Sequence, residues 1–543
     1  AIYLTASFNS DNQDYSMSSV TISGCKFNNN QAYQGYAIYI EGDECSTTFE
    51  LDSNIFTNNH GTSDHSTLGG IISSEITHLD KYNIINNNEF SIETTEDNIE
   101  KFIHVDHLGT RLPDATETPS ASPSELQAFI NRTFVGSVGY DQAQAGVGII
   151  QQISGCRFTN IHDTERNYYI KINKEIPIFD NIFENTELIT SGAKGGPLWS
   201  AFNGQLRLDN CKFIRISGKG GEGYVFTSNG QNTIHVTMNR CEFLDCGTTT
   251  DDLLPLITIL NSESSIKFYE CNFTFNDYSR NYRVLYLKDN AAVFDHCRFE
   301  KCGENTIYLS KDSSEANPQG TFEFTNNYVS SNEGTFINAA KIRSKPNISG
   351  NTFVDSTINN NYYIYISHNQ NDIEFSNNTF SRIITTGTTG TECGIILNII
   401  HHTNSEFSIK YIECNFYDII NHNTNSSYQG GAIEYGYTNT NNFNVHLEMR
   451  GCEFKRNKVK QHGGAICIRT GKSVLIDNCE FDSNIANDAS STSKLLFNNY
   501  YTDKTQGFGG AIYLTASFNS DNQDYSMSSV TISGCKFNNN QAY

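Results

Sequence analysis

The chain has 543 residues, of which 37 % are hydrophobic and 12 % aromatic, and its formal net charge at pH 7 is −23. This acidic balance argues against a nucleic acid as partner, and the 35 Phe and 29 Tyr residues argue against a disordered chain. No run of about 18 apolar residues is present, so this segment contains no candidate membrane-spanning helix.

The first 33 residues recur, letter for letter, later in the sequence. Residues 1–33 and 511–543 are identical, and the offset between them is 510 residues. We interpret 1–510 as one tandem repeat and 511–543 as the start of the next identical repeat. The chain is therefore expected to be part of a longer tandem array.

A shorter motif recurs throughout the chain, with about 16 copies in 510 residues. It has the form apolar-x-apolar-x-x-(Cys or Asn)-x-Phe-x-x-(Asn or Cys). Good copies are VTISGCKFNNN at 20–30, LRLDNCKFIRI at 206–216 and VLIDNCEFDSN at 474–484, whereas INRTFVGSV at 130–138 is a weak copy. Apolar and polar residues alternate within each copy, which is the period of a β-strand.

A second motif lies between the copies of the first one. It places an apolar pair after small residues, and its fullest forms are GGAIEY at 430–435, GGAICI at 463–468 and GGAIYL at 509–514. Many short strands that recur about every 30 residues are typical of a solenoid rather than a sandwich. We therefore predict an all-β fold in which each copy forms one coil of a parallel β-helix. Because parallel strands stack about 4.8 Å apart, about 16 coils advance about 77 Å per repeat.

Two segments interrupt this rhythm. Residues 104–127 are rich in Pro, Ser and Thr, and residues 487–508 are rich in Ser and Tyr. We predict both as loops inserted into the solenoid, since long surface loops cost little stability. The domain prediction is otherwise a single continuous β-helix over 1–543.

Cys and Phe of the C-x-F motif are two residues apart, so both point to the same side of a strand. Phe is expected inside, and Cys therefore also lies inside, as a small buried hydrophobic residue. One or two disulfides between coils are an alternative for this ladder. The predicted core ladder consists of Cys25, Phe27, Cys156, Phe158, Cys211, Phe213, Cys241, Phe243, Cys271, Phe273, Cys297, Phe299, Cys414, Phe416, Cys452, Phe454, Cys479 and Phe481.

The Asn residue three positions after Phe is predicted to lie at a coil corner. Its side chain is expected to form hydrogen bonds from coil to coil and to satisfy the backbone of the turn. These corner residues are Asn30, Asn59, Asn457 and Asn484. Candidate N-glycosylation sequons, relevant if the chain is secreted by a eukaryote, begin at Asn131, Asn272, Asn347, Asn377 and Asn425.

The paired GGAI and Phe-x-x-Asn motifs resemble the repeat of polymorphic outer membrane proteins. The Phe-x-x-Asn motif occurs at 27–30, 56–59, 454–457, 481–484 and 537–540. That family has a right-handed, pectin-lyase-like parallel β-helix and is found in chlamydial autotransporters and in large surface proteins of some protists. The resemblance implies a right-handed helix, export to the cell surface or extracellular space, and adhesion, with no catalytic residues to carry over.

No catalytic, cofactor-binding or metal-binding residues are predicted. The spacing C-x₂-C does not occur, and no Cys/His set has zinc spacing. Asp and Glu are scattered, and the close polar pairs 251–252, 93/96 and 401–402 are expected to be solvated loops. The basic residues Lys455, Arg456, Lys458 and Lys460 are expected to form a solvated face, or to meet an acidic neighbouring fibre.

The predicted function is therefore structural: a rod- or fibre-like β-solenoid subunit at the cell surface, with adhesion as a further role. The expected partners are the next tandem repeat, laterally bundled rods, and a host or matrix surface. Two alternatives are a polysaccharide-active β-helix enzyme, either a lyase or a glycosidase, and a glycan-binding module. An enzyme would require one groove with clustered carboxylates, whereas a structural rod would not.

Overall fold

The structure is a computed structural model in which the chain forms two units, Ala1–Asn261 (unit 1) and Ser262–Tyr543 (unit 2). The residues that it describes are 2–6, 8–9, 14–15, 19–32, 37–42, 48–57, 60–61, 70–76, 83–86, 89–91, 101–105, 127–130, 133–135, 140–141, 150–159, 162–163, 170–172, 177–188, 198–200, 203–218, 225–228, 232–247, 255–259, 261, 263–276, 283–288, 291–310, 321–340, 346–358, 363–367, 372–386, 397–400, 406–422, 430–435, 445–459, 462–468, 471–486, 509–514, 518–519, 524–525 and 527–542.

The described residues form β-strands and turns, and none of them lies in a helix. Strand β28 (Ile234–Asn239) illustrates why these residues form strands. Ile234, Val236 and Met238 are buried, whereas His235, between Ile234 and Val236, is exposed. This alternation places one side of the strand in the core and the other in solvent. The predicted all-β class is confirmed.

In unit 1, strands from successive copies of the motif pair in parallel. Sheet 1 contains β4 (Ser19–Ser23), β8 (Thr48–Asp52), β12 (Asn83–Asn86), β15 (Gln127–Ile130), β18 (Ile150–Ser154), β22 (Pro177–Phe179), β25 (Gly204–Asp209) and β28. Sheet 2 contains β5 (Lys26–Asn28), β9 (Ile55–Thr57), β13 (Glu89–Ser91), β16 (Thr133–Val135), β19 (Arg157–Thr159), β23 (Ile182–Leu188), β26 (Lys212–Gly218) and β29 (Glu242–Leu244), and β20 (His162–Asp163) also pairs with β23.

The second motif and the short strands form further parallel pairings in unit 1. Strands β1 (Ile2–Ala6), β7 (Ile38–Gly42), β11 (Gly70–Ile76) and β14 (Lys101–Val105) form a four-stranded parallel sheet. Sheet 3 is separate from it and contains β17 (Tyr140–Asp141), β21 (Ile170–Ile172), β24 (Leu198–Ser200), β27 (Phe226–Ser228) and β30 (Pro255–Ile259). Strands β6 (Gln31–Ala32) and β10 (His60–Gly61) pair in parallel, and β2 (Phe8–Asn9) and β3 (Asp14–Tyr15) form an antiparallel hairpin.

Unit 2 has the same organisation. Its sheet 1 contains β31 (Ser265–Tyr269), β34 (Ala291–Asp295), β37 (Phe322–Thr325), β40 (Pro346–Ser349), β44 (Ile373–Ser376), β48 (Phe407–Ile412), β52 (Val445–Arg450), β56 (Gly471–Asp477) and β62 (Met527–Ser533). Its sheet 2 contains β32 (Asn272–Thr274), β35 (Arg298–Glu300), β38 (Tyr328–Ser330), β41 (Thr352–Val354), β45 (Thr379–Ser381), β49 (Asn415–Tyr417), β53 (Glu453–Lys455), β57 (Glu480–Asp482) and β63 (Lys536–Asn538).

Two more sheets complete unit 2. Sheet 3 contains β33 (Arg283–Lys288), β36 (Ile307–Ser310), β39 (Ile337–Ala340), β43 (Ile364–Ser367) and β47 (Leu397–Ile400), with β51 (Ile433–Tyr435), β55 (Ile466–Ile468) and β59 (Ile512–Leu514) as a further row. Sheet 4 contains β42 (Thr357–Ile358), β46 (Ile384–Thr385), β50 (Ile420–Asn421), β54 (Lys458–Val459), β58 (Ile485–Ala486) and β64 (Gln541–Ala542). Strands β60 (Phe518–Asn519) and β61 (Asp524–Tyr525) form an antiparallel hairpin.

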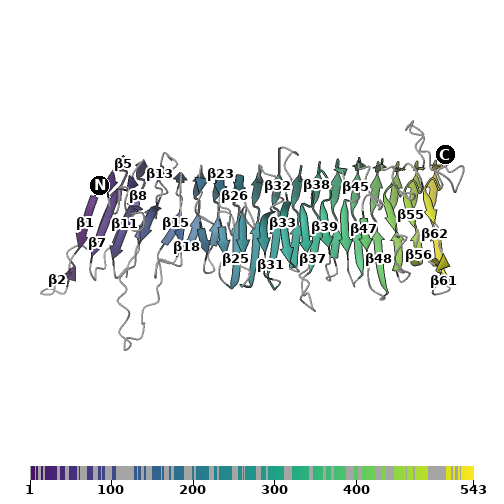
Figure 1. Ribbon diagram of the computed structural model, residues 1–543, viewed down its shortest axis with the longest axis horizontal. Coiled ribbons are helices and arrows are strands. Elements are labelled where there is room, and N and C mark those ends of the chain that lie inside the picture. The colour runs from purple at the N-terminus through teal and green to yellow at the C-terminus, as the bar shows by residue number, and fades with distance from the viewer. Residues whose placement is uncertain are drawn as a thin grey trace, which may run out of the picture. The chain divides into compact units, whose positions relative to one another are not determined.

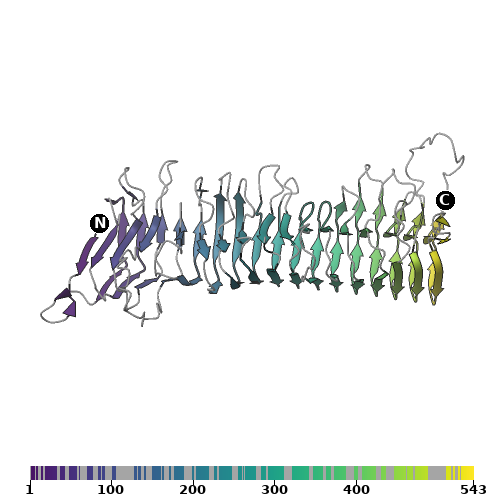
Figure 2. The same ribbon diagram turned by 60° about the horizontal axis from the view of Figure 1, so that its bottom comes forward.

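We call the strands contributed by one copy of the motif a rung. In Figure 1 the rungs of unit 2 with β37, β48, β56 and β62 follow one another in sequence order, and Figure 2 shows the same rows of strands from another side. Each rung pairs with the next one in parallel, so long parallel sheets run through each unit. This arrangement is compatible with a β-solenoid.

Aromatic rings form continuous stacks in the core. In unit 2 the rings of Phe353, Phe380, Phe416, Phe454 and Phe481 stack in succession, with neighbouring centroids 4.7–5.2 Å apart. In unit 1, Phe158, Phe183, Phe213 and Phe243 form a similar stack. The motif's Phe therefore packs against the Phe of the rungs on either side of it.

The two predicted insertions lie almost wholly outside the described residues. Of residues 104–127, His104 and Val105 belong to β14 and Gln127 to β15, so strands extend into both ends of this segment. Residues 106–126 and the whole of 487–508 are not described.

Candidate functional site

Most of the described rungs have two sharp corners, each of which begins with a residue in the left-handed region of φ. At the corner between sheets 1 and 2 this residue is, for example, Asn210 with φ +52° or Asn478 with φ +52°. At the corner between sheets 2 and 4 it is, for example, Arg456 with φ +58°. A left-handed residue turns the chain sharply, which directs the side chain that follows it into the interior.

At the first corner, the residue that follows the left-handed residue is Cys or Asn. Both residue types donate a hydrogen bond to the equivalent backbone carbonyl oxygen of the preceding rung. Cys452 donates from Sγ to the carbonyl oxygen of Tyr411 at 3.3 Å, and Asn351 donates from Nδ2 to that of Phe324 at 2.7 Å. In both cases the acceptor belongs to the preceding rung and lies three residues before the Cys or Asn of that rung's own first corner. The other thiol donors are Cys211, Cys241, Cys297, Cys414, Cys479 and Cys535, and the other amide donors are Asn54, Asn327 and Asn378.

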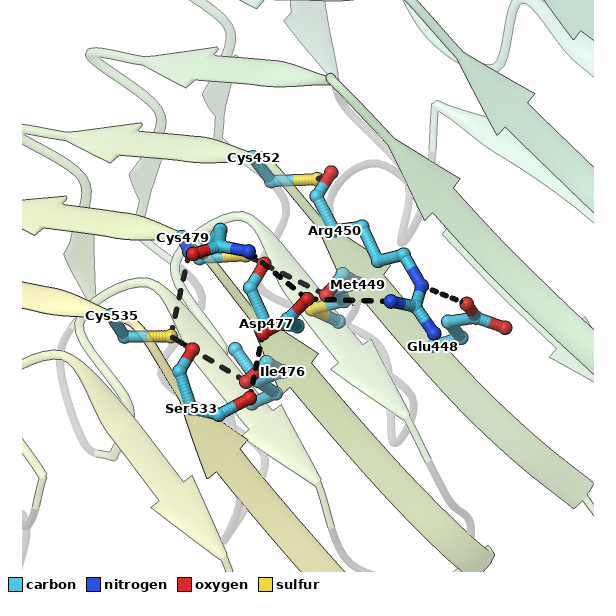
Figure 3. A network of polar contacts seen from close by, with 10 residues as sticks. Glu448, Met449, Arg450, Cys452, Ile476, Asp477, Cys479, Ser533 and Cys535 are labelled. Carbon is cyan, nitrogen blue, oxygen red and sulfur yellow. Dashed lines mark hydrogen bonds and ion pairs between the residues drawn. The ribbon is translucent and has the colours of Figure 1, made fainter.

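Asn makes a second bond that strengthens this corner. The Oδ1 atom of Asn351 accepts a hydrogen bond from the backbone N–H of Asn327 at 2.8 Å, and Oδ1 of Asn378 accepts one from that of Asn351 at 3.0 Å. Cysteine can imitate this contact weakly, as where the N–H of Cys479 donates to Sγ of Cys535 at 3.4 Å (Figure 3). The first corner is thus a continuous hydrogen-bonded ladder in unit 2, and in unit 1 the same bonds join Cys25 to Asn54 and the rungs from Cys156 to Cys241.

This position holds Cys in some copies of the motif and Asn in others, but the sequence analysis predicts no hydrogen-bonding role for the Asn residues there. The ladder Asn residues Asn54, Asn181, Asn327, Asn351 and Asn378, each at most 2 % exposed, were therefore missed as functional residues. The sequence signal that could have revealed them is the occurrence of both Asn and Cys at this position, because both have a small side chain that carries a hydrogen-bond donor.

At the second corner, three residues after Phe, the structure places Asn457 and Asn484 in a ladder of the same kind. Asn484 is fully buried; its Nδ2 donates to the carbonyl oxygen of Phe454 at 2.9 Å, and its Oδ1 accepts from the N–H of Asn457 at 3.0 Å. Asn457 makes the equivalent bonds to Phe416 and Ile419 of the rung before it.

The remaining second-corner residues differ from rung to rung. Asn30 is half-buried, and Asn59 lies outside the described residues. Cys246 occupies the position in its rung and donates to the carbonyl oxygen of Phe213 at 3.1 Å, whereas Ile383 and Ile419 fill it with apolar side chains. The polar ladder is therefore interrupted where an apolar residue fills the corner.

The predicted core ladder lies in the interior, with one correction. Cys25 is exposed, contrary to the prediction that it points inside. The physical reason is that ladder thiols point back at the preceding rung, whereas β4 pairs only with the following strand β8 among the described residues. The buried members are Phe27, Cys156, Phe158, Cys211, Phe213, Cys241, Phe243, Cys271, Phe273, Cys297, Phe299, Cys414, Phe416, Cys452, Phe454, Cys479 and Phe481.

The GGAI motif forms a turn in which successive rungs touch through their backbones. A Cβ atom on Gly431 would lie 1.9 Å from the carbonyl oxygen of Gly464, and one on Gly464 would lie 2.0 Å from that of Gly510. The alanines that follow, Ala432 and Ala465, are fully buried. Only glycine leaves room for this approach, which accounts for the repeated pair of glycines.

Two residues of the basic cluster, Lys455 and Arg456, pair with carboxylates within the fold. The guanidinium of Arg456 makes two bonds of 2.7 Å to the carboxylate of Asp418 in the preceding rung, and Nζ of Lys455 lies 2.9 Å from Glu453 and 3.4 Å from Glu480. Lys460 lies outside the described residues. The cluster is therefore not a free basic face, at least for Lys455 and Arg456.

Similar pairs follow the outer surface of both corners. Arg382 contacts Asp355 in the preceding rung at 2.5 Å, and this hydrogen bond lowers the pKa of Asp355. At the first corner, Arg450 bonds to Glu448 and lies 3.3 Å from Asp477, which in turn accepts from Ser533 at 2.6 Å (Figure 3). Exposed pairs of this kind stabilise a fold by only about 0–1 kcal/mol each, so their main effect is to fix the alignment of neighbouring rungs.

Of the candidate sequons, those at Asn272, Asn347 and Asn377 have exposed asparagines, whereas Asn131 and Asn425 lie outside the described residues. The close polar pairs at 93/96, 251–252 and 401–402 are not described either. Among the residues that are described, no three His, Cys, Asp or Glu side chains are grouped as they would be around a metal ion. The described part of the chain has no helix long and apolar enough to cross a membrane.

Three interior thiols, those of Cys211, Cys246 and Cys302, have a raised pKa. Burial raises the pKa of the Cys246 thiol to about 12 from its ordinary value of 9.0. The neighbouring thiol of Cys241, together with burial, raises the pKa of Cys211, and burial raises that of Cys302. All described cysteines are free thiols.

We expect a thiol reagent at pH 8 to modify Cys25 much faster than Cys246. Cys25 is exposed, whereas the buried thiol of Cys246 is almost wholly protonated and therefore a poor nucleophile. Mass spectrometry of peptides after brief alkylation of the folded chain measures both rates. After unfolding in denaturant the two rates should converge, and equal rates in the folded chain would contradict the placement of Cys246.

The same thiols predict how stability depends on pH. Between pH 9 and pH 12 the Cys246 thiol loses its proton in the unfolded chain but retains it in the folded chain. The free energy of unfolding should therefore decrease as the pH rises through this range. Denaturant titrations at pH 8 and pH 10 measure the difference, and a Cys246→Val variant should show a smaller decrease than the unsubstituted chain.

Comparison with known proteins finds no family model that matches this chain and no significant match among curated proteins.

Proposed function

We propose that this chain is part of a structural protein, a tandem-repeat β-solenoid of rod- or fibre-like form. In this proposal the rungs are coils of a right-handed parallel β-helix, with about 16 coils in each 510-residue repeat. The resemblance to polymorphic outer membrane proteins supports a place at the cell surface or outside the cell, with adhesion and lateral bundling of rods as further roles.

One observation carries the proposal. The identical segments 1–33 and 511–543 form the same set of strands, β4, β5 and β6 in one and β62, β63 and β64 in the other. The first set pairs with the rung that follows it, and the second set pairs with the rung that precedes it. One rung sequence is therefore suited to neighbours on both sides, which is what a continuing array requires.

The side chains described above support a mechanical role. Backbone pairing, phenylalanine stacks and two corner ladders all join one rung to the next within each unit. Each phenylalanine pair adds about 1 kcal/mol beyond the burial of its area. Since contacts of these kinds recur along the stack, stability is distributed rather than concentrated at one site.

The test is the length of a longer array. A chain made of residues 1–510 followed by 1–543 should form a particle about 77 Å longer than the 543-residue chain, because coils rise about 4.8 Å each. Electron microscopy of both chains measures the increment. A compact particle without this increment, or activity of the chain on a pectate-like polysaccharide, would exclude the proposal in favour of an enzyme.

A further inference from the structure

Two neighbouring rungs of unit 1 both have cysteine at the first corner. Strands β26 and β29 pair in register, with Lys212 opposite Glu242. Cys211 and Cys241 immediately precede these two residues, so they lie beside one another. The backbone N–H of Glu242 donates to the carbonyl oxygen of Cys211 at 2.9 Å, and both cysteine side chains are fully buried.

The spacing of these two cysteines suits a disulfide. Neighbouring parallel strands lie about 4.8 Å apart, and disulfides join Cα atoms that are about 4.4–6.8 Å apart. The Sγ atom of Cys241 donates to the carbonyl oxygen of Leu208 at 3.6 Å, so it points toward the rung that contains Cys211. A hydrogen bond between the two thiols, together with burial, raises the pKa of Cys211.

The hydrogen bonds that these thiols make to the preceding rung are weak. The Sγ atom of Cys211 lies 3.8 Å from the carbonyl oxygen of Ile178. By comparison, the Sγ atom of Cys246 lies only 3.1 Å from the carbonyl oxygen of Phe213. Because a thiol is a weak donor even at short distance, Cys211 and Cys241 lose little when they leave their acceptors.

We propose that Cys211 and Cys241 form a disulfide between neighbouring rungs when the chain folds in contact with a small-molecule disulfide, such as oxidised glutathione. One cysteine attacks the small-molecule disulfide to give a mixed disulfide, and the other cysteine then displaces the second glutathione. Two S–H bonds of the protein break and one S–S bond forms, while two electrons and two protons leave with two molecules of reduced glutathione. This inference goes beyond the proposed structural function and does not depend on it.

The disulfide is expected to form during folding rather than after it. In the folded rungs both thiols are buried, and the raised pKa of Cys211 leaves little thiolate to attack an oxidant. In the unfolded chain both thiols are accessible to the oxidant. Closure of one rung on the next then brings the two sulfur atoms together.

Cys156 and Cys246 are matched controls within the same unit, because both are buried but neither has cysteine at the equivalent position of an adjacent copy of the motif. At the corner of Cys156, the backbone N–H of this residue donates to Oδ1 of Asn181 at 3.0 Å. The residues at the equivalent positions are Arg132 and Asn181 for Cys156, and Ile216 and Asn276 for Cys246.

Mass spectrometry of the full chain, refolded from denaturant with oxidised and reduced glutathione and then alkylated, tests the proposal. The peptide pair that joins Cys211 to Cys241 should exceed any disulfide of Cys156 or Cys246 by about tenfold or more, because neighbouring thiols have a high effective concentration for each other. In a Cys241→Ala variant, Cys211 should be recovered as an alkylated thiol, since Asn181 is its neighbour on the other side.

A second arm tests the order of events. A chain that is folded under reducing conditions before oxidised glutathione is added should form the disulfide about tenfold more slowly or less, because its thiols are buried and protonated. An equal rate in the two arms would overturn the assignment of the reaction to the folding step.

Hydrogen exchange of the Glu242 amide shows in every sample whether the two rungs have formed, since this amide donates to Cys211. It should exchange about tenfold more slowly in the oxidised chain, because the disulfide restricts local opening. Recovery of Cys211 as an alkylated thiol from a glutathione-refolded chain with a protected Glu242 amide would overturn the proposal. Equal oxidation of Cys156 or Cys246 would also overturn it, because oxidation would then not depend on a neighbouring thiol.

Discussion

Replacing Gly464 by alanine should lower the free energy of unfolding of unit 2 by about 3 kcal/mol or more, beyond the usual range for an overpacked site. The new Cβ atom would lie 2.0 Å from the carbonyl oxygen of Gly510 and 2.7 Å from the backbone nitrogen of Ile485. Both contacts are with backbone atoms, so no flexible side chain can move aside to relieve them. Denaturant unfolding and hydrogen exchange in 430–486 measure the effect.

Gly451→Asn is the control for this substitution. Gly451 has φ +61°, and a Cβ atom there would meet only the flexible Cγ of Glu413 at 3.5 Å. Asn478 occupies the equivalent position of the next rung with φ +52°. We expect a change of about 1 kcal/mol or less, since asparagine tolerates this conformation. Equal destabilisation by the two substitutions would contradict the steric account of the GGAI turn.

Asn484→Ala should destabilise unit 2 by about 3 kcal/mol, because it removes the side-chain hydrogen-bond partner of two buried backbone groups. These groups are the N–H of Asn457 and the carbonyl oxygen of Phe454. Asn484 is fully buried, so water does not reach either group without local opening. Thermal unfolding gives the loss of stability, and faster exchange of the Asn457 amide should report it locally.

Asn484→Cys is the matched variant, because another rung of this chain has Cys at the same corner. Cys246 occupies the equivalent corner of its rung and donates to the carbonyl oxygen of Phe213, the counterpart of Phe454. Asn484→Cys should therefore keep one of the two bonds in weaker form and cost about 1–2 kcal/mol. If alanine and cysteine were equally destabilising, the shared role of Asn and Cys at the corners would be wrong.

The difference between the two corners shows where sequence reasoning was sufficient and where it was not. At the second corner, Asn457 and Asn484 stand out because the residue three places after Phe is so often Asn. At the first corner, Cys and Asn alternate, and hydrophobicity suggested a simple buried ladder for the cysteines. The common acceptor, the carbonyl oxygen three residues before the Cys or Asn of the preceding rung, becomes visible only when two rungs are placed in register.

The charged residues illustrate the same limit. The sequence places Lys455, Arg456, Lys458 and Lys460 close together, which suggested a basic face. Asp418, which neutralises Arg456, lies 38 residues away in the chain and belongs to the preceding rung. Such a pair depends on the length of the intervening loop, and no local pattern in the sequence reveals it.

By itself the sequence determined the class of fold, the period of the motif, the inward side of each strand and the identity of 1–33 with 511–543. These properties are local or periodic: alternation within a strand and recurrence about every 30 residues follow from the pleat of the strand and the size of one solenoid turn. Only the tertiary structure decided the bonds of the first corner and the close approach of the glycines. Each of these depends on which rung lies beside a given residue, and no local pattern in the sequence reveals that.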